Sequence, residues 1–272
     1  MNLTRRSSLA VLGLFGGAMA LPVRASQRRI ERIGVQLYTL RAAMALDTAA
    51  TLAAVAAAGY SEVEIAGTGN LKPEQFAEAL RNTALTAPSA HVPYELMRDQ
   101  PEEVLAMAQV IGCKYLVLPW LSPELRNVSG YAAVIDLLNR FGERCQKSSV
   151  QLCYHNHDFE FKPMDGEVAY DRLLGECDRD RVKFELDLYW VTHAGADGVA
   201  YLRADPERYP LCHVKDRSST GEMMDVGQGV IDFATLFAAG SGLRHYFVEH
   251  DKPVDALASI ITSVQALKRI RF

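Results

Sequence analysis

Short apolar runs alternate with longer amphipathic segments along the chain from Ile33 onward. The shortness of the apolar runs is typical of strands that are buried on both faces of a parallel sheet. The longer segments open with aspartate, proline or serine, and several end at a glycine, as from Asp47 to Gly59 and from Pro101 to Gly112. These residues are the usual start and stop signals of helices. The pattern therefore predicts repeated strand–helix units.

The repeat can be followed eight times. Strands are expected at 33–37, 63–66, 86–92, 115–118, 150–155, 182–187, 211–214 and 245–249. Helices are expected at 48–58, 73–81, 101–111, 129–147, 167–174, 197–204, 232–239 and 255–270. Eight units in about 240 residues favour an α/β fold of the closed (β/α)8 TIM-barrel type over an open doubly wound sheet. No glycine-rich nucleotide fingerprint follows the first strand.

The first residues have the pattern of an export signal. Arg5 and Arg6 precede an apolar run at 9–21, and small residues follow at 23–25. Paired arginines are typical of the twin-arginine route, and the apolar run is shorter than the roughly 20 residues of a membrane span. We therefore predict a cleaved signal peptide at 1–25, a barrel at 26–272, and a periplasmic or otherwise exported protein without stable membrane association. An uncleaved anchor or an amphipathic helix is the alternative.

Composition narrows the function further. The net charge of −4 gives no support to a nucleic-acid-binding surface. Five cysteines are present, an odd number without CxxC spacing, and a disulfide is left open for an oxidising compartment. Cys153 and Cys212 lie in apolar strand runs, and we expect them to be small buried hydrophobes rather than disulfide partners or thiolate ligands. The expected partner is therefore a small molecule, and the sequence leaves assembly into a homo-oligomer open.

Four of the predicted strands end in residues that can bind a metal. These residues are separated by 32, 26 and 36 positions, about one strand plus one helix each time, and are His155, Asp187, His213 and Glu249. The carboxyl ends of barrel strands surround one central point, so the four side chains should converge. Imidazoles and carboxylates together suit Mn²⁺, Co²⁺, Zn²⁺ or Mg²⁺. Buried together, they would be costly without a metal or mutual pairing.

Residues close to these ligands are candidates for catalysis. Side chains two positions apart in a strand share a face, so Lys215 accompanies His213. It is a candidate acid or electrostatic partner of an enolate, with a solvated lysine as the alternative. The role of His157 is left open: it can be a metal ligand, a substrate contact or a residue that supports the ligands from behind. Glu185 is expected one layer deeper, and Glu160 is expected in a solvated loop.

Other strand ends supply candidates for substrate binding. Glu64 and His91 fit contacts to sugar hydroxyls or a second acid–base pair. Trp120 and Trp190 fit stacking on a sugar ring, with plain packing as the alternative. Arg217 is a further substrate-binding candidate. The glycine-rich loop at 225–229 is either a cover over the barrel mouth or a simple turn.

At these residues the chain resembles the xylose isomerase-like TIM-barrel superfamily, which includes sugar phosphate isomerases/epimerases. The most specific pieces are Glu185-Leu-Asp187, the 213–217 segment, and Val248-Glu249. The resemblance implies a divalent metal held by residues matching Asp187, His213 and Glu249. His155 stands where ketose 3-epimerases have a glutamate, so only one of their two catalytic glutamates, Glu249, is present.

The resemblance implies enolate chemistry on a sugar. A metal acidifies a C–H next to a carbonyl, a base removes the proton, and an acid protonates an oxygen. We expect Glu249, His155 or His157 as base and Lys215 or His91 as acid. Export favours an unphosphorylated keto-sugar or oxidised glycoside. We therefore predict a metal-dependent isomerase or epimerase, with a 3-keto-glycoside lyase or hydratase, or a non-catalytic exported sugar-binding barrel, as alternatives.

Overall fold

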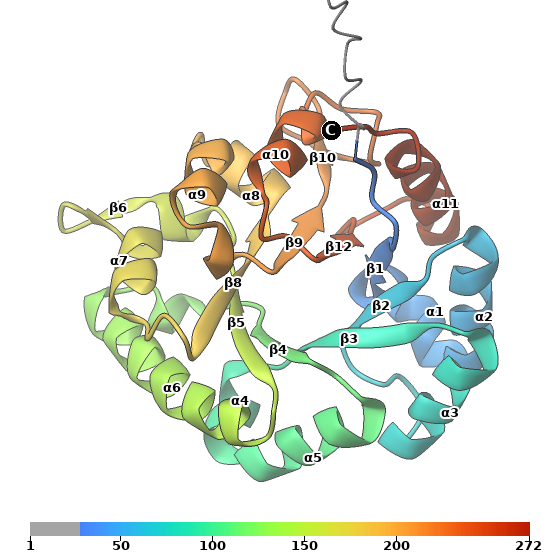
Figure 1. The fold of residues 1–272 in the computed structure, drawn as a ribbon, viewed down its shortest axis with the longest axis horizontal. Helices are drawn as coiled ribbons and strands as arrows, with labels where there is room; N and C mark the ends of the chain where they lie inside the picture. Colours follow the sequence, from blue (N-terminus) through green and yellow to red (C-terminus); the bar gives the residue numbers. More distant parts are fainter. Residues whose placement is uncertain (1–27) are drawn as a thin grey trace, which may run out of the picture.

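The computed structural model describes residues 28–272, in which eight parallel strands close into a barrel with helices around it (Figure 1). The predicted (β/α)8 TIM barrel is therefore confirmed. The predicted signal peptide at 1–25 lies outside the described residues. Backbone hydrogen bonds between Arg28 and Phe272 hold the two ends of the described segment together.

Each strand of the barrel lies within one residue of its predicted bounds. The strands are β1 (Gly34–Gln36), β2 (Glu62–Ile65), β3 (Thr86–His91), β4 (Tyr115–Leu118), β5 (Gln151–His155), β8 (Val182–Asp187), β9 (Leu211–Val214) and β12 (His245–Val248). They pair in chain order, and β12 closes the barrel on β1 with Gly34 opposite Phe247.

All eight predicted helices are present, together with three shorter ones. The helices are α1 (Arg41–Leu46), α2 (Thr48–Ala58), α3 (Pro73–Thr83), α4 (Tyr94–Asp99), α5 (Pro101–Ile111), α6 (Val128–Lys147), α7 (Ala169–Glu176), α8 (Leu188–His193), α9 (Gly198–Ala204), α10 (Phe233–Ala239) and α11 (Ala256–Leu267). The start signals act as expected, since Asp47, Asp197, Asp232 and Asp255 accept hydrogen bonds from the first helical turns.

Two small hairpins were not predicted. In one, β6 (Pro163–Met164) pairs with β7 (Glu167–Val168), so the helix expected from residue 167 begins instead at Ala169. In the other, β10 (Asp216–Arg217) pairs with β11 (Met223–Met224). Two-residue strands bury too few apolar side chains to leave a periodic signal in the sequence.

The inside of the barrel has an apolar layer and a polar layer. Val117, Cys153, Leu211 and Phe247 form a separate buried apolar cluster. Gly34 makes room for one of these side chains, because a Cβ atom at this position would lie 2.4 Å from Cδ1 of Phe247. Toward the carboxyl ends of the strands the buried side chains become polar and charged. This end of the barrel is therefore where chemistry can occur.

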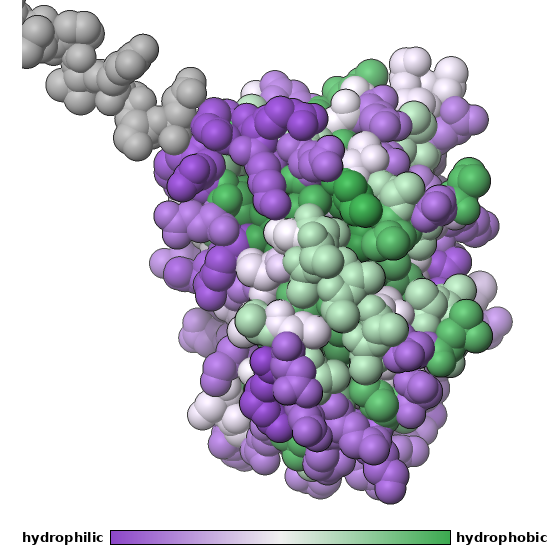
Figure 2. All heavy atoms as spheres, turned by 90° about the vertical axis from the view of Figure 1, so that its right-hand side faces the viewer, coloured by the Kyte–Doolittle hydropathy of each residue, from purple (hydrophilic) through white to green (hydrophobic). Residues whose placement is uncertain are grey.

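The outer surface mixes polar and apolar regions. Figure 2 views the side that carries α2, α3 and α11, where apolar residues gather. On α2 four alanines are exposed, namely Ala49, Ala50, Ala53 and Ala57. None of the helices within residues 28–272 has both the length and the apolar character of a membrane span. The five cysteines are buried and unpaired, which confirms the expectation for Cys153 and Cys212.

Candidate active site

The four predicted metal ligands meet at the carboxyl end of the barrel. His155 ends β5, Asp187 ends β8, His213 lies in β9 and Glu249 directly follows β12. All four are buried, and one ligand atom from each lies within 4.8 Å of those from the others. The register of the strands produces this arrangement, since Asp187 is paired with His213 across β8 and β9.

The ring of His155 is oriented by the backbone. Its Nδ1 atom lies 2.9 Å from the carbonyl oxygen of Pro119, which can only accept a hydrogen bond. The opposite nitrogen, Nε2, lies 3.2 Å from Oδ2 of Asp187. Burial, reinforced by the charge of His213, lowers the pKa of His155 to about 4, so the ring is neutral at pH 7. Nδ1 then carries the only proton, and Nε2 presents a lone pair toward the centre of the site.

The ring of His213 is oriented by a carboxylate. Its Nε2 atom lies 2.6 Å from Oε2 of Glu64, and its Nδ1 atom lies 2.9 Å from Oε2 of Glu249 without hydrogen-bond geometry. Burial lowers the pKa of His213, but the surrounding carboxylates, led by Glu185 and Glu249, raise it well above its ordinary value. The centre therefore attracts positive charge, which either a proton or a divalent cation on Nδ1 can supply.

A buried lysine balances the carboxylates. The Nζ atom of Lys215 lies 3.0 Å from Asp187, 2.6 Å from Glu249 and 2.9 Å from Asp251. Burial opposes its charge, yet these three carboxylates hold the pKa of Lys215 well above its ordinary value. Burial likewise raises the pKa of Glu249, but Lys215 and His213 outweigh it and hold that pKa well below its ordinary value. The pair is therefore ionised.

A second polar cluster lies beneath the first. Glu64 accepts hydrogen bonds from Gln36 and Ser89 as well as from His213. Nε2 of His91 lies 3.1 Å from Glu64 and 2.9 Å from Glu185. Burial lowers the pKa of His91, but the two carboxylates raise it to about 9. Glu64 is thus fully buried and supports His213 and His91 rather than facing solvent.

His157 and Glu160 form a unit next to the ligands. Burial, reinforced by His155 and Lys215, lowers the pKa of His157 well below its ordinary value, and its Nδ1 atom has no hydrogen-bond partner among the described residues. The expectation of a solvated Glu160 was wrong, because this carboxyl is fully buried. It accepts hydrogen bonds from the Tyr154 hydroxyl at 2.6 Å and the His157 backbone N–H at 2.8 Å.

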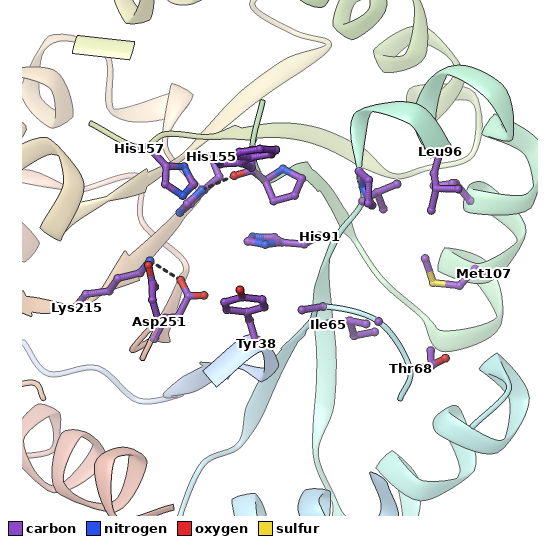
Figure 3. Close-up of a pocket in the computed structure, with 18 of the residues that line it drawn as sticks. Tyr38, Ile65, Thr68, His91, Leu96, Met107, His155, His157, Lys215 and Asp251 are labelled. Carbon is purple, nitrogen blue, oxygen red and sulfur yellow. Dashed lines mark hydrogen bonds and ion pairs between the residues drawn. The ribbon is translucent and has the colours of Figure 1, made fainter. Parts of the chain in front are cut away.

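A cavity of about 760 Å³ opens beside these residues. Figure 3 shows Lys215, Asp251, His157, His155 and Tyr38 at one end, with His91 between them and the other wall. Six of the predicted site residues line the cavity: His91, Trp120, His155, His157, Lys215 and Glu249. The buried ligands Asp187 and His213 lie behind this lining.

Three predicted substrate contacts do not line the cavity, namely Glu64, Trp190 and Arg217. The ring of Trp190 packs against His157, and Lys215 Nζ lies 5.8 Å from its centroid. The guanidinium of Arg217 donates to the Ser218 carbonyl in the β10–β11 hairpin. Trp190 therefore lies behind His157, and Arg217 lies in the hairpin outside the cavity lining.

The glycine-rich loop at 225–229 is held outside the cavity by hydrogen bonds. Gly227 and Gly229 donate backbone hydrogen bonds to Asp216, and Val226 donates to Ser263 on α11. No residue of the loop lines the cavity. Asp251 is a site residue that sequence reasoning did not assign, although it lies two positions after Glu249, and Tyr38 also lines the cavity.

Comparison with known proteins agrees with the barrel fold. A family model described as xylose isomerase-like TIM barrel matches residues 52–239. Two structures of sugar phosphate isomerase/epimerase proteins from Parabacteroides distasonis are similar: one at 26% identity and TM-score 0.76, covering 86% of this chain and 96% of that one. The other has 25% identity and TM-score 0.75, covering 92% and 98%. The IolI protein, whose structure has a bound zinc atom, shares the fold at 16% identity, TM-score 0.64 and coverage of 86% and 96%. No curated protein matches significantly.

Proposed function

Because the chain belongs to the xylose isomerase-like TIM-barrel family, we propose that it is a divalent-metal-dependent isomerase or epimerase of a small carbohydrate. The similarity to two sugar phosphate isomerase/epimerase structures supports a sugar-processing role. The reaction we infer removes a proton from a carbon next to a carbonyl. The resulting enolate is then reprotonated, or it expels a neighbouring group.

One observation carries the proposal of a metal. His155 and His213 each have one ring nitrogen facing an acceptor, Pro119 or Glu64, while the other nitrogen faces a carboxylate. Such outer contacts are how proteins fix the tautomer of metal-binding histidines. His155, Asp187, His213 and Glu249 would hold the ion. When bound, a divalent cation would polarise a substrate carbonyl and acidify the adjacent C–H.

We assign the base to His157. Its ring is neutral near pH 7 and lines the cavity. Glu249 is the alternative base, but its Oε2 atom already lies 2.6 Å from Lys215 and 2.9 Å from His213. A carboxylate held by two cations is a weak base, so its role as a ligand is favoured.

Two further cavity residues supply positive charge. Lys215 remains an ammonium and lines the same wall, where it can stabilise negative charge that develops on a substrate oxygen. His91, with its pKa raised to about 9, is protonated at pH 7 and can donate a proton. His157 would then remove the proton that forms the enolate, and His91 would donate a proton in the later step.

The substrate we propose is an unphosphorylated keto-sugar or oxidised glycoside. Among the described residues that line the cavity, the lysines are Lys215 and Lys252, and no arginine is present. Lys215 is already paired with three carboxylates, which leaves little charge to bind a phosphate. The signal-like residues at 1–25 support export, and we propose a periplasmic location on that basis.

Elimination from a 3-keto-glycoside is the second candidate. The carboxylates that line the cavity are Glu249 and Asp251, which leave the same strand and both contact Lys215. They cannot act on opposite faces of an enediolate as two independent bases. One base and one acid suffice for elimination, and His157 with His91 meets that need.

Product analysis separates these reactions. The metal-loaded protein is incubated with 3-keto-glucosides and free ketoses in parallel, and products are identified by NMR. Isomers or epimers support the first proposal, and release of the glycoside's leaving group supports the second. Binding of sugars without any conversion across the panel would indicate a non-catalytic sugar-binding barrel.

A further inference from the structure

The cavity has two chemically different ends. Lys215, Asp251, His155 and His157 lie at one end (Figure 3), where Glu249 contacts Lys215. The other end is formed by the carboxyl ends of β2 and β3 and by helices α4 and α5. The side chains there are mostly apolar and are contributed by Ile65, Val92, Leu96, Val104 and Met107, with Thr68 as a polar member. No charged residue lines this wall in the part of the chain that the structure describes.

The cavity is larger than one sugar requires. Its volume of about 760 Å³ falls within the roughly 300–1,000 Å³ of pockets that hold drug-sized ligands, several-fold more than a single sugar ring fills. A free monosaccharide held by the polar end would leave the apolar wall facing water. Covering that wall would contribute affinity in proportion to the apolar area buried.

Aromatic rings stand at the edge of this cavity. Trp120 is 45% exposed and Tyr38 is 44% exposed, and both line the cavity. Arg126 packs against the Trp120 ring, with its Cζ atom 4.9 Å from the centroid, which holds the indole in place. A flat aromatic ring of a ligand gains binding free energy from contacts with such groups, and it loses little rotamer freedom on binding.

We propose that the apolar end is a subsite for an aromatic aglycone, so that the substrate is an aryl glycoside whose oxidised sugar occupies the polar end. This inference rests on the proposed function for the sugar, and it adds what lies beyond the sugar. The subsite is formed by Ile65, Val92, Leu96, Val104, Met107 and Trp120. It selects glycosides with a neutral aromatic group over free sugars and methyl glycosides.

The test compares binding of phenyl and methyl 3-keto-β-glucoside to the metal-loaded protein by calorimetry. The phenyl compound should bind at least about tenfold more tightly. Leu96→Asp places a charge in the subsite at a side chain that is 39% exposed, so folding is retained. It should reduce the phenyl preference at least threefold, and Trp120→Ala should do the same. Leu257→Asp, at a 42% exposed leucine of α11 outside the cavity, is the matched control.

The outcomes distinguish the two proposals. Equal affinity for both glycosides, or a preference that Leu96→Asp and Trp120→Ala leave unchanged, overturns the aromatic subsite while the sugar-binding site stands. Failure of both glycosides to bind overturns the proposed substrate class and this inference with it. A phenyl preference that falls in the cavity variants and persists in Leu257→Asp supports the subsite.

Discussion

The Nε2 atom of His155 lies 3.2 Å from Oδ2 of Asp187, and neither atom carries a proton in the ionisation states that their surroundings favour. The proton of His155 is on Nδ1, facing Pro119. Burial opposes the ionisation of Asp187, but the neighbouring Lys215 ammonium holds its pKa below its ordinary value. Two lone pairs at this distance repel each other unless a cation binds both. This pair is therefore the clearest indication of a metal site.

Replacing His155 should weaken metal binding. In His155→Gln the imidazole lone pair is lost, and we expect the dissociation constant for Mn²⁺ or Zn²⁺ to rise at least about 100-fold, more than the typical effect of removing an outer contact. Metal titration by calorimetry measures this. His193→Gln, at an exposed histidine outside the cluster, is the control. Unchanged affinity in His155→Gln would remove His155 from the ligand set.

Glu64 should act on the metal through His213. In Glu64→Gln the carboxylate that accepts the hydrogen bond from Nε2 of His213 becomes an amide. The imidazole ring is then held less firmly in its orientation and is less basic. We expect metal affinity to fall roughly 10- to 100-fold. Glu62→Gln is a matched control, because Glu62 lies on the same strand but contacts His245 instead. Equal losses in both variants would point to a general effect on the fold.

His157 should be needed for chemistry but not for metal binding. His157→Gln should lower the rate of proton abstraction roughly 10²- to 10⁴-fold at unchanged metal stoichiometry. Glu249→Gln, by contrast, should lose both metal and activity. The rate and the metal content are measured on the same preparations. Full activity of His157→Gln would transfer the role of base to Glu249.

Glu160 should make stability depend on pH. Burial raises the pKa of its carboxyl from 4.5 to about 7, so between these values the folded protein holds a proton that the unfolded chain releases. The contribution of Glu160 to the free energy of unfolding is fully present below about pH 4.5. It is lost as the pH rises to about 7, and the free energy of unfolding then falls by at most roughly 3 kcal/mol. Urea unfolding at pH 5 and pH 8 should show this loss in the wild type. Glu160→Gln should show less of it, and parallel behaviour of the two proteins would contradict the assignment.

The sequence was sufficient to predict the barrel and its strands. Strands buried on both faces leave unbroken apolar runs, and capping residues such as Asp47 and Asp255 mark where helices begin. The hairpin at Pro163–Val168 and the short helices α1, α4 and α8 were not predicted, because they are too short to leave a periodic pattern in the sequence. Their positions depend on tertiary packing.

The site was predictable where it follows strand ends. His155, Asp187, His213 and Glu249 lie at or near the carboxyl ends of four neighbouring strands, and their spacing along the chain indicates this. Glu160 was misplaced because its burial depends on the hydroxyl of Tyr154, on the opposite side of its own strand from the ligands. The packing of Trp190 behind His157 depends likewise on how a helix leaves its strand, which the residue pattern does not encode.

Solvent deuterium incorporation tests the central claim most directly. The protein is prepared with divalent metal and, separately, after chelation, and each form is incubated in D₂O with a panel of keto-sugars and 3-keto-glucosides. We predict exchange at the carbon next to the carbonyl with the metal-loaded form and its loss after chelation, with recovery on adding metal back. Absence of exchange across the panel, or exchange that chelation does not alter, would contradict metal-assisted enolate chemistry at His155, Asp187, His213 and Glu249.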